Sequence, residues 1–266
     1  MHARLMLISI LLLSLNAPTT STGAAAQSPE EKGLAIAVEA DRRDQSFGDV
    51  SVGLEMTLRN RHGEESRRKI RVATLEVSGD GDKSLTVFDE PADVKGTALL
   101  TFSHKRADDD QWLYLPALAR VKRISSANKT GSFMGSEFAY EDIGSQEVEK
   151  YEYKYIRDEV YEGRPSFVIE RYPASPHSGY TREVVWVDQE RYHSWKVEYY
   201  DRKQSLLKTL TLSGFRQYLG KHWRPGEMFM HNHQNGKSTR LTWSDYKFRV
   251  GLRDADFTEA GLKRAR

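Results

Sequence analysis

Hydrophobic and polar residues alternate with a period of two over much of this 266-residue chain. The run Val50, Val52, Leu54, Met56 and Leu58 is the clearest example. A period of two places alternate side chains on opposite faces of a β-strand. Similar runs recur to the end of the sequence, separated by short turn signals such as Asn235-Gly236, a strong hairpin signal. The pattern predicts an antiparallel meander of about ten or eleven strands.

Helical signals are few. Ser28-Pro29-Glu30-Glu31 forms a capping box that predicts a helix to about Arg43, with Leu34, Ala37 and Val38 on one face. Further short helices are expected near Leu118, over 136–140 and over 258–263. A sheet of so many strands tends to curl on itself. We therefore expect a mainly β (α+β) fold, in which a strongly curved antiparallel sheet forms an incomplete β-barrel with a few short helices over its concave face. That helix content is too small to fill the apolar interior.

The N-terminus has the features of a secretory signal peptide. Arg4 is followed by an apolar run over 5–15, and Ala24-Ala25-Ala26 offers a cleavage site, so we assign 1–26 to a cleaved signal peptide. Since no linker or repeat follows, 27–266 is expected to form a single domain. The chain has no cysteine, which rules out a lipid anchor on cysteine and disulfide bonds. We expect a soluble, unlipidated periplasmic protein.

Charge and motifs exclude several function classes. Without 1–26, which contains one Arg and no acidic residue, 39 basic residues face 38 acidic ones, too balanced for a nucleic-acid-binding surface. The Gly-x-Ser-x-Gly, P-loop and His-Glu-x-x-His motifs are missing. His231 and His233 share one strand face, but the sequence shows no third ligand, so no metal or cofactor is predicted.

Residues 111–142 combine an aromatic strand, a basic segment and a Gly-Ser-aromatic run. Trp112–Pro116, Arg123-Ile124, Phe133–Phe138 and Tyr140–Asp142, with Phe88, Pro91 and 96–100 upstream, resemble the outer membrane lipoprotein-sorting protein family. These periplasmic proteins are relatives of the LolA and LolB carriers and often accompany RND-type exporters. The resemblance covers most of the chain after residue 30 and is most specific at 88–142. It implies a LolA-like half-barrel fold.

Aromatic and basic residues of this region are the candidate site. We expect the apolar cavity and a mobile flap over it to be formed by Leu100, Phe102, Trp112, Tyr114, Phe133, Met134, Phe138 and Tyr140. Such a surface can hold acyl chains through buried area alone. Arg120, Lys122 and Arg123 are expected at the rim, facing an anionic headgroup or an acidic partner. The plainer alternatives are ordinary core residues, a fixed plug and a solvated loop.

The sequence therefore predicts a non-catalytic periplasmic carrier that binds lipid or lipoprotein acyl chains. By resemblance, its partner would be an RND-type or Lol-type component of the inner membrane, with peripheral membrane contact at most. The alternative is an accessory or adaptor subunit of a membrane transporter that has no ligand of its own. A third hypothesis, a hydrolase using Glu137, Glu141 or Asp142, lacks an identifiable acid–base pair.

Overall fold

The computed structural model describes residues 27–263, so the predicted signal peptide lies outside the described residues. Fifteen strands, two α-helices and several 3₁₀ turns follow one another along this part of the chain. The helices and strands are α1 (Pro29–Asp44), β1 (Asp49–Arg59), β2 (Glu65–Leu75), β3 (Lys83–Glu90), β4 (Ala98–Phe102), β5 (Asp110–Leu115), β6 (Arg120–Ile124), β7 (Tyr151–Tyr161), β8 (Arg164–Pro173), β9 (Tyr180–Asp188), β10 (Ser194–Asp201), β11 (Leu206–Ser213), β12 (Arg216–Tyr218), β13 (His222–Arg224), β14 (Glu227–Asn232), β15 (Ser238–Phe248) and α2 (Glu259–Leu262).

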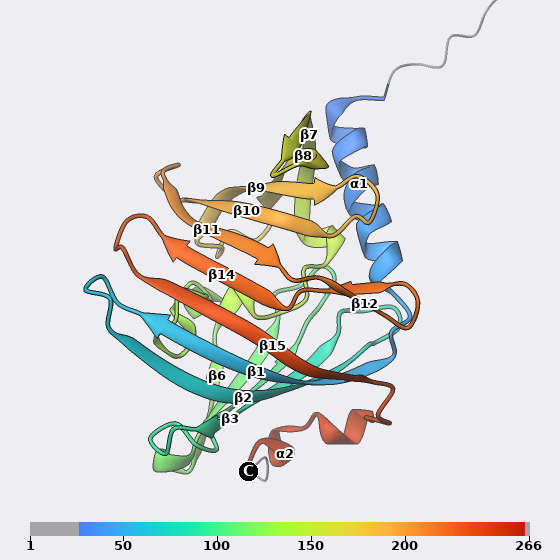
Figure 1. The fold of residues 1–266 in the computed structure, drawn as a ribbon. Helices are drawn as coiled ribbons and strands as arrows, with labels where there is room; N and C mark the ends of the chain where they lie inside the picture. The colour runs from blue at the N-terminus through green and yellow to red at the C-terminus, as the bar shows by residue number, and fades with distance from the viewer. Residues whose placement is uncertain (1–26, 264–266) are drawn as a thin grey trace, which may run out of the picture.

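Thirteen strands form one antiparallel sheet in the order β6-β5-β4-β3-β2-β1-β15-β14-β11-β10-β9-β8-β7. Two meanders are joined where β1 pairs with β15, from Val50 opposite Phe248 to Arg59 opposite Ser238. Within residues 27–263, β6 and β7 have a strand neighbour on one side only, so the sheet is not closed into a barrel. Figure 1 shows the strong curvature of this sheet. The mainly β fold with few helices is confirmed.

The expected strand count of ten or eleven was too low. Pro225-Gly226 separates β13 from β14, because proline cannot donate to a strand ladder. The small β12–β13 ribbon is separate from the large sheet. The basic segment at Arg120–Ile124 is an edge strand, a position where charged side chains discourage further strand pairing.

Helix α1 begins at the predicted capping box. The Ser28 hydroxyl accepts a hydrogen bond from the Glu31 amide at 3.1 Å, and the Glu31 carboxylate accepts one from the Ser28 amide at 2.8 Å. Of the three residues expected on one face, Ala37 is buried, whereas Leu34 and Val38 are 46% and 48% exposed. The helix packs against β7 so closely that a Cβ on Gly33 would lie 2.7 Å from the Tyr155 nitrogen. The buried face of the helix consists of Gly33 at this close backbone contact together with Ile36 and Ala37.

The main apolar core lies on one face of the sheet, which we call the inner face. It contains Leu54, Met56, Ile70, Leu99 and Leu113, among other residues of both meanders. A smaller cluster lies on the opposite, outer face of β3–β5, under a C-terminal segment that includes α2. No helix among residues 27–263 combines the length and apolar character that a membrane span requires.

Candidate functional site

The connection between β6 and β7 is the unusual element of this fold. The two strands are consecutive in the chain but lie at opposite edges of the sheet, so residues 125–150 must travel from one edge to the other. We call these residues the strap. The strap crosses the inner face, where its residues Phe133 and Phe138 belong to the main core cluster. In Figure 1 the green strap lies inside the curve of the sheet.

The helical turns of the strap are all of the 3₁₀ type, at Ser126–Asn128, Phe133–Gly135, Tyr140–Asp142 and Val148–Lys150, and one isolated antiparallel bridge joins Ser132 to Ala139. We expected the interior to be incompletely filled because the chain has little helix. That expectation overlooked a strap that covers apolar surface without forming an α-helix. The two short helices expected near Leu118 and over 136–140 are likewise 3₁₀ turns, at Pro116–Leu118 and Tyr140–Asp142.

Two aromatic side chains anchor the strap in the core. Phe133 and Phe138 are 2% and 3% exposed. The Phe133 ring lies 5.8 Å from the ring of Phe88 and 5.6 Å from that of Tyr140, measured between centroids. Met134 has a positive φ of 51°, a strained backbone conformation for a residue other than glycine. The strap residues of the candidate site therefore lie together against the inner face.

A buried ion pair fastens the strap to the sheet. The Lys208 amine of β11 lies 2.6 Å from the Asp142 carboxylate and donates a second hydrogen bond to the Glu137 carbonyl oxygen at 3.0 Å. The Tyr180 hydroxyl donates a hydrogen bond to the Asp142 carboxylate at 2.9 Å. The Glu137 amide donates to the Thr239 hydroxyl at 2.9 Å. Charged and polar groups from β9, β11 and β15 thus converge on one short stretch of the strap.

Glu141 makes a second attachment, to the loop before β9. Its carboxylate accepts hydrogen bonds from the Ser178 hydroxyl at 2.8 Å and from the Gly179 amide at 2.9 Å. Burial raises the pKa of Glu141 to about 7, and the neighbouring charge of Asp142 adds to this effect. The attachment therefore includes a carboxyl group that changes charge near neutral pH.

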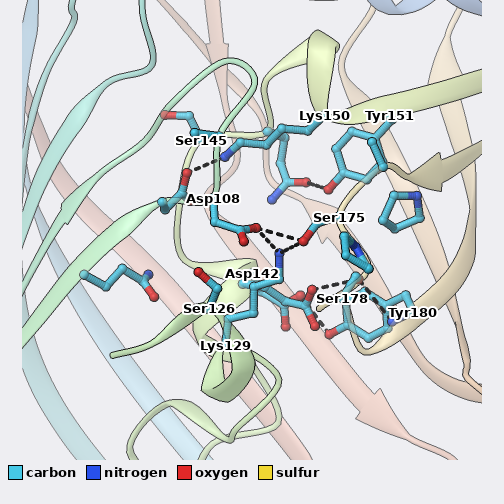
Figure 2. Close-up of a pocket in the computed structure, with 18 of the residues that line it drawn as sticks. Asp108, Ser126, Lys129, Asp142, Ser145, Lys150, Tyr151, Ser175, Ser178 and Tyr180 are labelled. Carbon is cyan, nitrogen blue, oxygen red and sulfur yellow. Dashed lines mark hydrogen bonds and ion pairs between the residues drawn. The ribbon is translucent and has the colours of Figure 1, made fainter. Parts of the chain in front are cut away.

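A polar cavity of about 250 Å³ adjoins this attachment. It lies between the strap, the β4–β5 loop and the β8–β9 loop, and Figure 2 shows its hydroxyl and charged groups facing one another. Its polar side chains include Asp108, Asp109, Lys129, Glu141, Asp142, Ser145, Lys150, Ser175, Ser178 and Glu183. Tyr151 and Tyr180 also line it and pack against the main core. The cavity is therefore a polar space at the border of the apolar interior.

The remaining apolar residues of the predicted site lie elsewhere. Leu100, Phe102, Trp112 and Tyr114 belong to the outer-face cluster, which Phe257 and Leu262 of the C-terminal segment also join. On the same strands, Leu99 and Leu113 face inward. The eight predicted residues thus form two groups on opposite faces of the sheet rather than one lining. A ligand-binding role for the outer group stays a prediction.

The predicted rim residues lie on the edge strand β6. Arg120, Lys122 and Arg123 are all exposed, and Arg123 also forms an ion pair with Asp110 and lies 6.0 Å from the Trp112 ring centroid. His231 and His233 have ring centroids 4.9 Å apart, and His233 contacts the Thr209 hydroxyl at 2.8 Å. Within residues 27–263, no group of three potential metal ligands forms.

Sequence reasoning missed the residues that hold the strap. Lys208, Thr239 and Ser178 lie on β11, β15 and the β8–β9 loop, far along the chain from Asp142 and Glu137. A lysine at position 208, the one charged residue of the strand β11, was the available signal. It is buried because Asp142 neutralises it.

Fold and site together define a class of protein: an open, curved antiparallel β-sheet whose apolar inner face is covered by a strap. Solved structures of this class match the chain over nearly its whole length. An outer membrane lipoprotein-sorting protein domain from Vibrio parahaemolyticus is 55% identical, with a TM-score of 0.87, covering 88% of this chain and 100% of that one. A DUF1329 family protein from Desulfovibrio piger is 34% identical, with a TM-score of 0.84, covering 88% of this chain and 99% of that one.

The chain therefore belongs to the outer membrane lipoprotein-sorting protein family, whose members have a LolA-like fold. A LolA superfamily protein from Nitrosomonas europaea, 23% identical with a TM-score of 0.69, shares this fold over 86% of this chain and 98% of that one. The sequence model of a family described as an uncharacterized protein matches residues 80–264. No curated protein matches the chain.

Proposed function

We propose that the protein is a periplasmic carrier that holds lipid or lipoprotein acyl chains against the inner face of its sheet. Residues 27–266 would act as one domain without catalysis, and the sheet would serve as an incomplete barrel. One observation carries the proposal: a strand-to-strand connection covers the apolar inner face, to whose core helix α1 adds Ile36 and Ala37. Such a cover can be displaced without breaking any pairing of the large sheet. The lipoprotein-sorting relative supports the same function.

Relative to water, burying an acyl chain outweighs exposing the two aromatic side chains that anchor the strap. Exposing Phe133 and Phe138 would cost roughly 3–6 kcal/mol, whereas burying an acyl chain of about fifteen methylenes recovers roughly 12 kcal/mol relative to water. An acyl chain that leaves a membrane was already buried there, so its transfer gains little by itself. A membrane partner would therefore have to supply the direction of transfer. We propose an RND-type or Lol-type transporter component in this role, with β6 as the contact.

A reversible crosslink between strap and sheet tests the carrier function. The Glu137 amide lies 2.9 Å from the Thr239 hydroxyl, so Glu137→Cys with Thr239→Cys brings two thiols close together. The chain has no other cysteine to interfere. We expect the oxidised protein to take up no fluorescent fatty acid, and the reduced protein to recover uptake. Each single-cysteine variant, which cannot form the crosslink, serves as the matched control.

Equal uptake by the oxidised and reduced forms would contradict the proposal. Native mass spectrometry of protein purified from the periplasm gives a second measurement, since a carrier should retain lipid. A protein that is always empty but binds a transporter tightly would instead be the adaptor described above.

A further inference from the structure

Among residues 27–263, one carboxylate of the polar cavity has no ion-pair partner. Four of its five acidic side chains each face one basic partner: Asp108 with Lys129 at 2.7 Å, Asp109 with Lys150 at 2.5 Å, Asp142 with Lys208 at 2.6 Å, and Glu183 with Arg171 at 2.5 Å. Glu141 is the fifth. Among residues 27–263 it forms no ion pair, and its side-chain partners are the Ser178 hydroxyl and the Gly179 amide.

The unmatched carboxylate lies in a space that can hold a small group. The cavity of about 250 Å³ could accommodate several non-hydrogen atoms, and two of its walls are the rings of Tyr151 and Tyr180. Arg171 and Lys208 already lie 4.7 and 5.1 Å from the ring centroids of Tyr151 and Tyr180, so Glu141 is the group that would attract a further cation. The basic side chains Lys129 and Lys150 do not make the cavity positive, because each is held by its own aspartate. Arg106, the remaining basic residue of the lining, is exposed.

We infer that this cavity binds a primary ammonium group, with Glu141 as its counter-ion and the two tyrosine rings beside it. This inference rests on the proposed carrier function, because the cavity borders the apolar interior through Tyr151 and Tyr180. An amine-bearing headgroup could lie in the cavity while its acyl chains lie against the inner face. The same chemistry is available in a free amine, and the experiment separates these two sources.

Binding should strengthen as the pH rises through neutrality. Burial raises the pKa of Glu141 to about 7, so the carboxyl group loses its proton between pH 6 and 8. A primary ammonium stays charged over this range, as the lysine side chain does. The charged groups that face Glu141 are Asp142, which disfavours its ionisation, and Lys129, which favours it. An ammonium ligand, like Lys129, would favour the ionised form of Glu141.

Calorimetric titration with dihexanoyl phosphatidylethanolamine and dihexanoyl phosphatidylglycerol, below their micelle concentrations, tests the inference. These probes carry the same acyl chains and differ in the headgroup. We expect the ethanolamine lipid to bind at least tenfold more tightly at pH 8, with a smaller preference at pH 6. Glu141→Gln should remove the preference and leave the glycerol lipid unaffected. Glu137→Gln, on the same strap but bound to Asn232 outside the cavity, should keep it.

Glycerophosphoethanolamine and free ethanolamine are the arms without acyl chains. If either of them binds to the wild type and not to Glu141→Gln, the ammonium site in the cavity is supported, even when neither lipid binds. Failure of both lipids to bind would then overturn the carrier function alone. Tighter binding of ethanolamine than of the ethanolamine lipid would identify a free amine as the ligand. Equal affinity for the two lipids, or a preference that persists in Glu141→Gln, would overturn the inference. A thermal unfolding curve of each variant verifies that it is folded.

Discussion

The amine of Lys208 on β11 and the carboxylate of Asp142 in the strap lie 2.6 Å apart, and their side chains are only 4% and 5% exposed. Removing one member of a buried ion pair leaves the other charge without a partner. We predict that Lys208→Met lowers the free energy of unfolding by about 3–5 kcal/mol, measured by urea denaturation.

The double variant Lys208→Met with Asp142→Asn is the control for that result. Asparagine keeps an acceptor for the hydroxyl of Tyr180 but has no charge to leave unpaired. It should therefore regain much of the lost stability. A single variant as stable as the wild type would show that the pair does not hold the strap.

The sequence could predict the strands because each strand has its own local pattern. The alternation over 50–58 and the capping box at Ser28–Glu31 both identified elements that the structure contains. Alternation divides a strand into two faces but does not say which face is inside. Trp112 and Tyr114 were the larger side chains of β5, yet Leu113 between them faces the main core. Which face is buried depends on the elements that pack against it, and the strand's own residues do not identify those elements.

The candidate site was harder to predict because it depends on long-range topology. The strap crosses the inner face only because β1 pairs with β15 and leaves β6 and β7 at opposite edges. That pairing joins residues almost 200 positions apart, from Val50 to Phe248. The aromatic residues Phe133 and Phe138 were predicted as a flap. Their polar attachments could not be, since Lys208 and Thr239 come from strands much later in the chain.

Strap and sheet core should respond differently to loss of a buried side chain. Phe133→Ala removes an anchor of the strap, and Leu100→Ala removes a residue that is equally buried on the outer face. Cavities of this kind cost about 2–5 kcal/mol. We predict that both variants lose stability in urea, but that only Phe133→Ala accelerates the uptake of a fluorescent fatty acid. Faster uptake in both would mean that general loosening, rather than the strap, limits entry.

Stability should also depend on pH through Glu141. Burial raises the pKa of Glu141 from 4.5 to about 7 in the folded protein, so the folded state binds this proton more tightly than the unfolded state does. The resulting stabilisation is complete below the unfolded pKa of about 4.5 and is lost as the pH rises through 7. This shift in the pKa of Glu141 corresponds to at most about 3 kcal/mol of unfolding free energy.

We predict that Glu141→Gln, which stays neutral, reduces the loss of unfolding free energy between pH 5 and pH 8. Asp82 is a useful control because burial raises its pKa to about 7 as well, at a place outside the strap. Asp82→Asn should therefore remove the contribution of Asp82 to the pH dependence of the unfolding free energy and leave the contribution of Glu141 unchanged. The double variant should lose both contributions. Urea denaturation at pH 5, 6, 7 and 8 measures all four proteins. If Glu141→Gln keeps the full wild-type slope, the carboxyl group of Glu141 does not titrate in this range, and the attachment of the strap to Ser178 and Gly179 does not respond to pH.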